Sequence, residues 1–119
     1  MKRALLAIRN RLVLEAVANA LKRAGFFVEK SSSQEPERIL TLTNALAATT
    51  LVMDVTRSGD GTFDMRMNTA REARRRNPEI KIALLCDNVS DESSAYKVKC
   101  AKEDGSIDAF FYESVPSDY

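Results

Sequence analysis

The stretch TTLVMDV, residues 49–55, decides the fold. It is a short apolar run with a single carboxylate, Asp54, near its downstream end. A run of this length, with apolar runs on both sides of it in the chain, is typical of a central strand that is covered on both faces. Parallel sheets built from such strands bind their ligands just beyond the carboxyl ends of the strands. Asp54 is therefore predicted to lie where folds of this kind carry out their chemistry.

Similar short apolar runs recur along the whole chain. Glycine, proline or polar residues bound each run, which is typical of strands in a buried sheet. The expected strands are residues 4–8, 26–30, 49–55, 81–86 and 109–112.

Amphipathic segments separate these runs and carry apolar residues at the three- and four-residue spacing of a helix. Gly25 and Gly105 are expected to end the first and the last of these helices. Asn68 or Thr69 is expected to cap the third helix, which runs to Arg76. The other expected helices cover residues 11–24, 34–48 and 91–104.

Strand and helix thus alternate through five strands. This alternation predicts an α/β domain of three layers, in which right-handed crossovers join the strands of a parallel sheet. Pro116 would suit the first turn of a fifth helix. Because the sequence stops at Tyr119, we expect the fifth helix to be absent or truncated.

Composition excludes several classes of function. The 119 residues fit one domain, 1–119, and the net charge of +1 creates no strong attraction to nucleic acid or membrane. Without histidine, and with Cys86 and Cys100 far apart, the chain has no zinc cluster and no Ser-His or Cys-His nucleophile. No glycine-rich phosphate loop is present. No apolar run approaches the roughly 20 residues that span a bilayer, so we expect a cytoplasmic protein.

The order and spacing of these segments resemble a bacterial response-regulator receiver domain over essentially the whole length. The resemblance rests on the apolar first strand, the first helix ending at Gly25, LVMD at residues 51–54, residues 71–85, and DAFFYES at residues 108–114. The last segment is similar to the N-terminal domain of helix-turn-helix response regulators. Domain 1–119 is therefore also interpreted as the N-terminal part of a longer regulator.

The resemblance implies a particular sheet and a particular role for Asp54. The sheet would have the strand order 2-1-3-4-5, as in CheY-like and flavodoxin-like folds. Asp54 would take the position that accepts a phosphoryl group from a histidine kinase. Tyr112 falls at the position of a switch-like aromatic residue, one residue before the position of a lysine.

The rest of the family's site does not match, so that Asp54 is the only matching residue. Receivers end the first strand with two acidic residues that hold Mg²⁺, the fourth strand with a hydroxyl residue, and the fifth strand with the lysine. The residues at these positions here are Arg9 and Asn10 (Ile8 and Arg9 in a gapless reading), Cys86 and Glu113.

These replacements remove the cations on which phosphoryl transfer depends. The reaction is catalysed mainly by positioning and by neutralising the charge on the phosphoryl oxygens. Mg²⁺ needs an octahedral set of oxygens with well-placed carboxylates, so we expect no cofactor, no metal site and no catalytic residue. We hypothesise that Arg9 pairs with Asp54 and takes the place of the metal, because the first and third strands are neighbours in this topology.

Each of these residues also has a simpler, structural interpretation. Asp54 is interpreted foremost as a structural residue retained at a strand end, and Cys86 as a small buried hydrophobic residue. A run of arginines also invites a nucleic-acid interpretation, but the segment lacks aromatic residues, and Glu72 stands four residues before Arg76. A solvated helix face is favoured for this run, which comprises Arg71, Arg74, Arg75 and Arg76.

The sequence favours a non-enzymatic, receiver-like signalling module that acts through protein–protein contacts. Its expected partners are a histidine kinase, a downstream regulator, or a second copy of the chain, since Phe110 or Tyr112 would be exposed without a fifth helix. The alternatives are a receiver phosphorylated on Asp54, and the regulatory half of a DNA-binding transcription regulator. Nucleic acid would then be bound only through a domain beyond Tyr119, and no membrane contact is expected.

Overall fold

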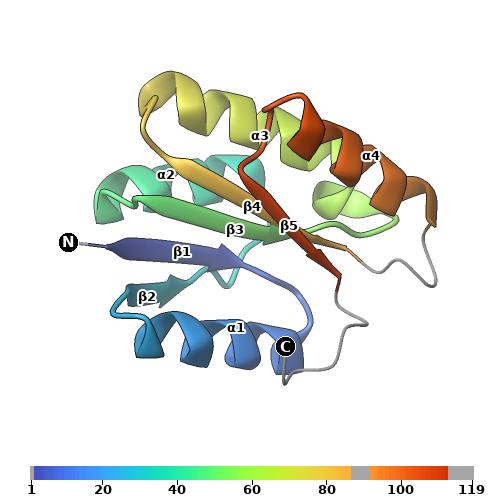
Figure 1. Ribbon diagram of the computed structural model, residues 1–119. Helices are drawn as coiled ribbons and strands as arrows, with labels where there is room; N and C mark the ends of the chain where they lie inside the picture. Colours follow the sequence, from blue (N-terminus) through green and yellow to red (C-terminus); the bar gives the residue numbers. More distant parts are fainter. Residues whose placement is uncertain (1, 87–91, 113–119) are drawn as a thin grey trace.

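Parallel strands form one sheet in the order β2-β1-β3-β4-β5 in the computed structural model, which describes residues 2–86 and 92–112 (Figure 1). This order confirms the predicted three-layer α/β fold. The strands are β1 (Arg3–Ala7), β2 (Phe27–Lys30), β3 (Thr50–Asp54), β4 (Lys81–Cys86) and β5 (Ala109–Tyr112). The helices are α1 (Arg11–Arg23), α2 (Pro36–Leu46), α3 (Phe63–Arg76) and α4 (Glu92–Glu103), with a short 3-10 helix, η1 (Gly59–Gly61).

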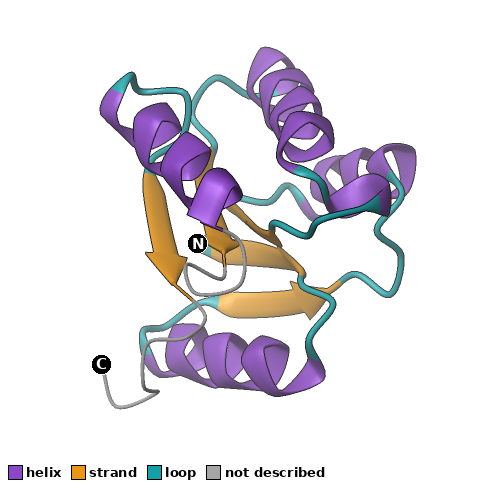
Figure 2. Ribbon diagram, turned by 90° about the vertical axis from the view of Figure 1, so that its right-hand side faces the viewer, coloured by secondary structure: helices purple, strands orange, loops and turns teal. Residues whose placement is uncertain are grey.

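The helices cover the two faces of the sheet unequally. Among the described residues, α2, α3 and α4 lie on one face and α1 lies alone on the other (Figure 1 and Figure 2). The larger apolar core lies under the three helices, and a smaller one lies under α1. Residues 113–119 and 87–91 lie outside the described residues, so the expectation for a fifth helix at Pro116 concerns a segment that is not described.

Strand β3 is central because it pairs with β1 on one side and with β4 on the other. Leu51 and Met53 are fully buried and point to the larger core, whereas Val52 between them joins the smaller one. This alternation follows from the two-residue period of a strand, so every apolar residue of the run is buried on one face or the other. Asp54 ends the strand at the carboxyl edge of the sheet, as predicted.

Helix α3 begins earlier than the sequence analysis expected. Thr62, and neither Asn68 nor Thr69, is the N-cap, and its side-chain oxygen accepts a hydrogen bond from the Met65 main-chain N–H. The helix then runs from Phe63, so that Met67 and the small residues after it pack on the sheet. The prediction was wrong because the apolar face of the helix begins five residues before Asn68.

The exposed aromatic residue of β5 also differs from the expectation. Phe110 is half-buried against the core under α2, α3 and α4, whereas Phe111 is 58% exposed. Successive residues of a strand face opposite sides, so Phe111 points to the face that α1 shares with Ala109. The side chain of Tyr112 lies outside the described residues.

The start of α3 can be tested by removing the cap. Thr62→Ala is expected to lower the free energy of unfolding by about 1 kcal/mol, because a main-chain N–H of the first turn loses its acceptor. Asn68→Ala is the matched control, since Asn68 is exposed within the helix. It should have almost no effect on urea-induced unfolding followed by circular dichroism. An equal loss in both variants would contradict the observed helix start.

Candidate functional site

Asp54 is buried at the carboxyl end of β3, with only 3% of its side chain exposed. Its two carboxylate oxygens have different partners. Oδ2 accepts a hydrogen bond of 2.9 Å from the main-chain N–H of Arg9. Oδ1 lies 2.9 Å from Nη2 of Arg66, with which it forms an ion pair. Each carboxylate oxygen therefore has a hydrogen-bond partner within the chain itself.

Arg66 brings its guanidinium to this carboxylate from helix α3. The side chain is completely buried, and its Nε donates a 2.8 Å hydrogen bond to the main-chain oxygen of Asp54. Nη2 also donates to the main-chain oxygen of Ala7 at 3.3 Å and to Oε1 of Gln34. One side chain thus connects the ends of β1 and β3 with the loop before α2.

The position of Arg66 follows from the early start of α3. Counting from Phe63, the positions that turn toward the sheet are spaced by three or four residues and include the site of Arg66. Met67, Ala70 and Ala73 on the same helix are buried with it. An arginine on the buried face of a helix must find acceptors inside the domain, because an unpaired charge in the interior is very costly.

The charges around Arg66 act on its pKa in opposite directions. Burial lowers the pKa of the guanidinium, while the hydrogen bond and the charge of Asp54 raise it. Asp60 raises the pKa further and the charge of Arg9 lowers it. Because the pKa of an arginine ordinarily lies far above neutral pH, Arg66 stays charged. The site therefore holds a buried carboxylate beside a buried cation.

The hypothesis that the Arg9 side chain pairs with Asp54 is wrong. Arg66 is the cation at the carboxylate, and Arg9 contributes only its main-chain N–H. Beyond the end of β1 the main chain of Arg9 faces Asp54, so its side chain is left on the exposed side. Arg9 remains close enough for its charge to influence Arg66.

The other predicted positions that the structure describes are a helix cap, Asn10, and a buried residue at the end of the neighbouring strand, Cys86. Asn10 is the N-cap of α1, and its side-chain oxygen accepts hydrogen bonds from the main-chain N–H groups of Leu12 and Val13. Cys86 is fully buried at the end of β4, as expected for a small hydrophobic residue, and pairs in register with Tyr112. Glu113 lies outside the described residues.

Three arginines at the end of α3 form ion pairs with acidic side chains, namely Arg74, Arg75 and Arg76. Glu72 forms ion pairs with Arg75 at 2.5 Å and with Arg76 at 3.2 Å, the second of which was predicted from their spacing. The hydrogen bond from Arg75 is the main cause of the low pKa of Glu72, which falls to about 2. Arg74 instead pairs with Asp108 at 2.6 Å and so links α3 to the start of β5.

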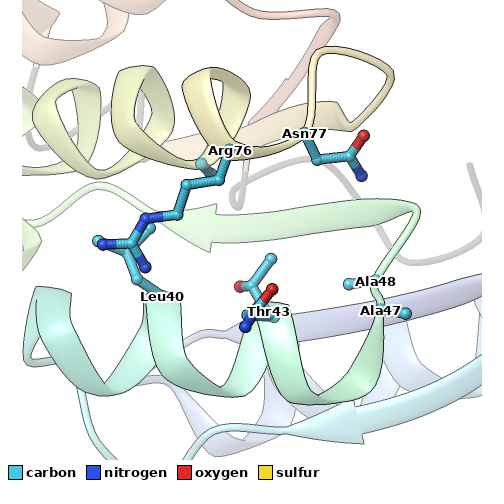
Figure 3. A pocket seen from close by; sticks show the side chains of 8 residues that line it. Leu40, Thr43, Ala47, Ala48, Arg76 and Asn77 are labelled. Carbon is cyan, nitrogen blue, oxygen red and sulfur yellow. The ribbon is translucent and has the colours of Figure 1, made fainter.

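Two shallow pockets on the helical layer lie away from Asp54. One of about 220 Å³ lies between the ends of α2 and α3, where the Arg76 side chain reaches across toward Leu40 (Figure 3). The other, of about 270 Å³, lies between α3 and α4 and is lined by Phe63 and Tyr96 among others. Neither is lined by Asp54 or Arg66, so both are separate from the buried ion pair.

Solved structures of response regulators share this fold over the whole chain. A response regulator from Thermotoga maritima matches with a TM-score of 0.73 and 19% identity, covering 100% of this chain and 90% of the other. The response regulator TrrA of the same organism, in complex with Mg²⁺–BeF, matches with a TM-score of 0.70 and 19% identity, covering 99% and 91%. NtrX from Brucella abortus matches with a TM-score of 0.71 and 16% identity, covering 99% of this chain but only 25% of its own.

These matches define the fold as that of a CheY-like receiver domain, and thus confirm the predicted resemblance at the level of fold. No protein-family model and no curated protein matches the sequence. No helix within residues 2–86 and 92–112 is long and apolar enough to cross a lipid bilayer.

The residues around Asp54 do not fit the Mg²⁺ ion that this fold implies. Both carboxylate oxygens already accept hydrogen bonds, and the nearest cation is the guanidinium of Arg66. In the described part of the chain no three carboxylate, cysteine or histidine side chains are placed to hold a metal. A divalent cation at Asp54 would have to displace Arg66 or lie beside its positive charge, and Mg²⁺ also requires a near-octahedral set of oxygens.

Sequence reasoning missed Arg66 and Gln34 as members of this site. The signal for Arg66 was its place on the apolar face of α3. The prediction missed it because it placed the start of the helix at Asn68 or Thr69, after Arg66. Gln34 carried no signal, because it meets Arg66 only through the tertiary fold, after the crossover from β2.

The ion pair can be tested by removing its cation. Arg66→Met keeps the volume of the side chain but leaves Asp54 as an uncompensated buried charge, so the free energy of unfolding should fall by about 3–5 kcal/mol. Arg75→Met is the matched control on the same helix, because the Arg75 side chain is 71% exposed. It should leave the urea unfolding midpoint almost unchanged. A small loss for Arg66→Met would show that the ion pair does not stabilise the domain.

Proposed function

We propose that this protein is a non-enzymatic, receiver-like signalling module that acts through protein–protein contacts and without an aspartyl phosphate. The observation that carries the proposal is the buried ion pair of Asp54 with Arg66, which is 2.9 Å long. In this arrangement the carboxylate that would attack a phosphoryl group is occupied on both oxygens. The receiver scaffold is retained while its acceptor is held in a structural role.

Three physical terms oppose phosphorylation at Asp54. The carboxylate is buried, so a phosphodonor has no direct access to it. It would have to break its ion pair before it could act as a nucleophile. The transferring phosphoryl group would also lack the metal ion that usually neutralises its charge. Two of the three nitrogens of Arg66, Nε and Nη2, already donate to oxygens of the chain, so they are not free to neutralise a phosphoryl group.

A phosphodonor experiment tests the proposal directly. The full chain is incubated with Mg²⁺ and acetyl phosphate and then analysed by intact mass, with a phosphorylatable receiver domain treated in parallel. We expect no phosphoryl adduct, because Asp54 is both buried and paired. Asp54→Asn identifies the source of any adduct that forms. An adduct that is present in the native chain and absent from Asp54→Asn would overturn the proposal in favour of a phosphorylatable receiver.

A second candidate function is the regulatory part of a longer transcription regulator. The match to NtrX favours it, because this chain covers only a quarter of that protein. In such an arrangement the present domain would bind partner proteins, and nucleic acid would be bound by a separate domain. This candidate keeps the same role for Asp54 and differs only in what the domain is attached to.

The proposed partners are proteins, including a histidine kinase, a downstream regulator and a second copy of the chain. Phe111 on β5 is one of several large apolar side chains exposed on the described surface, and it lies at an edge of the sheet. Strand β5 is an edge strand, paired only with β4, and carries the exposed Phe111. Edge strands with exposed apolar side chains favour association unless they are covered.

Self-association through this edge can be measured by sedimentation over a wide range of protein concentration. We expect a dimer at high concentration, and Phe111→Ser should weaken it by at least about tenfold, since one large aromatic anchor commonly dominates an interface. Phe27→Ser on the opposite edge strand is the matched control, because Phe27 is 51% exposed on β2. A native chain that stays monomeric throughout would exclude the second copy as a partner.

A further inference from the structure

Four oxygen atoms enclose the guanidinium of Arg66. Two belong to Asp54, its main-chain oxygen and Oδ1, and the others are the main-chain oxygen of Ala7 and Oε1 of Gln34. They come from the end of β1, the end of β3 and the loop before α2, and only one of them carries charge. We call this set the oxygen cage.

The oxygen cage has the composition of a cation-binding site. Its members are two main-chain carbonyls, an amide carbonyl and a carboxylate, all of which are acceptors only. Without a cation, these converging oxygens would include a buried carboxylate with no counter-ion, an arrangement of high energy. The chain avoids this arrangement by inserting a cation of its own, which is tethered to α3 through the Arg66 side chain.

Two of the three guanidinium nitrogens, Nε and Nη2, make all of these contacts. Nε and Nη2 are adjacent donors in one plane, and they reach the main-chain oxygen and Oδ1 of Asp54 at 2.8 and 2.9 Å. Such a planar pair of N–H donors matches two neighbouring oxygens in a way that a spherical ion does not. Nη1 on the opposite side is buried and has no hydrogen-bond partner in the described part of the chain. The third nitrogen is therefore not needed for recognition.

We infer that the oxygen cage is a binding site for planar cations with two adjacent N–H donors, namely guanidinium and amidinium ions. In the native chain Arg66 occupies it. When this side chain is shortened, the cage should accept a free cation of the same class. Because Nη1 donates no hydrogen bond to any described residue, an amidinium, which has only two nitrogens, should bind about as well as a guanidinium. Mg²⁺ should bind poorly, since it demands an octahedral set of oxygens at short distances.

The inference is independent of whether Asp54 ever receives a phosphoryl group. It concerns how the cage selects a cation, and its readout is thermal stability, whereas the proposed function is tested by covalent mass. Failure of one test is thus distinguishable from failure of the other.

The experiment restores the missing cation to Arg66→Ala. Thermal unfolding of the full chain is followed with added guanidinium chloride or acetamidinium chloride in the low millimolar range, where denaturation is negligible. Sodium, tetramethylammonium and magnesium chlorides are compared at equal ionic strength. We expect both planar cations to raise the melting temperature of Arg66→Ala saturably, with no such rise for the other salts. The native chain should show no rise, because Arg66 already fills the cage.

Asp54→Asn/Arg66→Ala provides the control for location. It removes the charged member of the cage, so the planar cations should no longer stabilise the protein. No saturable rise in Arg66→Ala, an equal rise with tetramethylammonium, a larger rise with magnesium, or a rise that persists in the double variant would each overturn the inference.

A second variant keeps the inference falsifiable if Arg66→Ala does not fold under any condition. Arg66→Lys retains a positive charge and a long side chain but lacks the planar pair of donors. It should melt at nearly the same lowered temperature as Arg66→Met. A melting temperature for Arg66→Lys close to that of the native chain would show that the cage accepts any compact cation, which contradicts the inference.

Discussion

The ion pair between Asp54 and Arg66 is the interaction on which the arrangement around the sheet depends. Neither group is stable alone in the interior, because a buried charge without a partner costs several kcal/mol even after relaxation. Together they are neutral, and every oxygen near the guanidinium accepts a hydrogen bond. The pair requires β1, β3, α3 and the loop before α2 to meet at one point. It therefore connects α3 and the loop before α2 to the carboxyl edge of the sheet.

The same interaction places a cation of the chain itself beside the central aspartate of this receiver fold. In a parallel sheet the strand ends bring carbonyl and carboxylate oxygens together, and that concentration of negative charge needs a cation. A metal ion supplies it reversibly, whereas a tethered guanidinium supplies it permanently. Under the proposed function, a tethered guanidinium in the place of a metal ion gives Asp54 a structural role.

Much of the architecture could be predicted from local patterns. The runs at β4 and β5 were expected with the bounds that they have, and β3 differs from its prediction by no more than the usual variation at strand ends. These segments were readable because burial on both faces leaves a continuous apolar run that few other structures produce. Helix α3 was harder, since its first turn contains Asp64 and Arg66 among apolar residues, which interrupts the apolar pattern. Because the helix was expected to begin at Asn68 or Thr69, Arg66 fell outside it and was not considered as the partner of Asp54.

The sequence by itself determined the fold class, the strand order through its resemblance to receivers, and the place of Asp54 at the carboxyl end of the central strand. These properties depend on the period of apolar residues and on the chirality of crossovers, which act over short stretches of chain. Only the tertiary structure decided which cation meets Asp54. Arg9 and Arg66 are equally charged in the sequence, and Arg9 follows the neighbouring strand β1. Arg66 presents its side chain to the buried carboxylate, whereas Arg9 presents only its main-chain N–H. The packing of α3 on the sheet decides this difference.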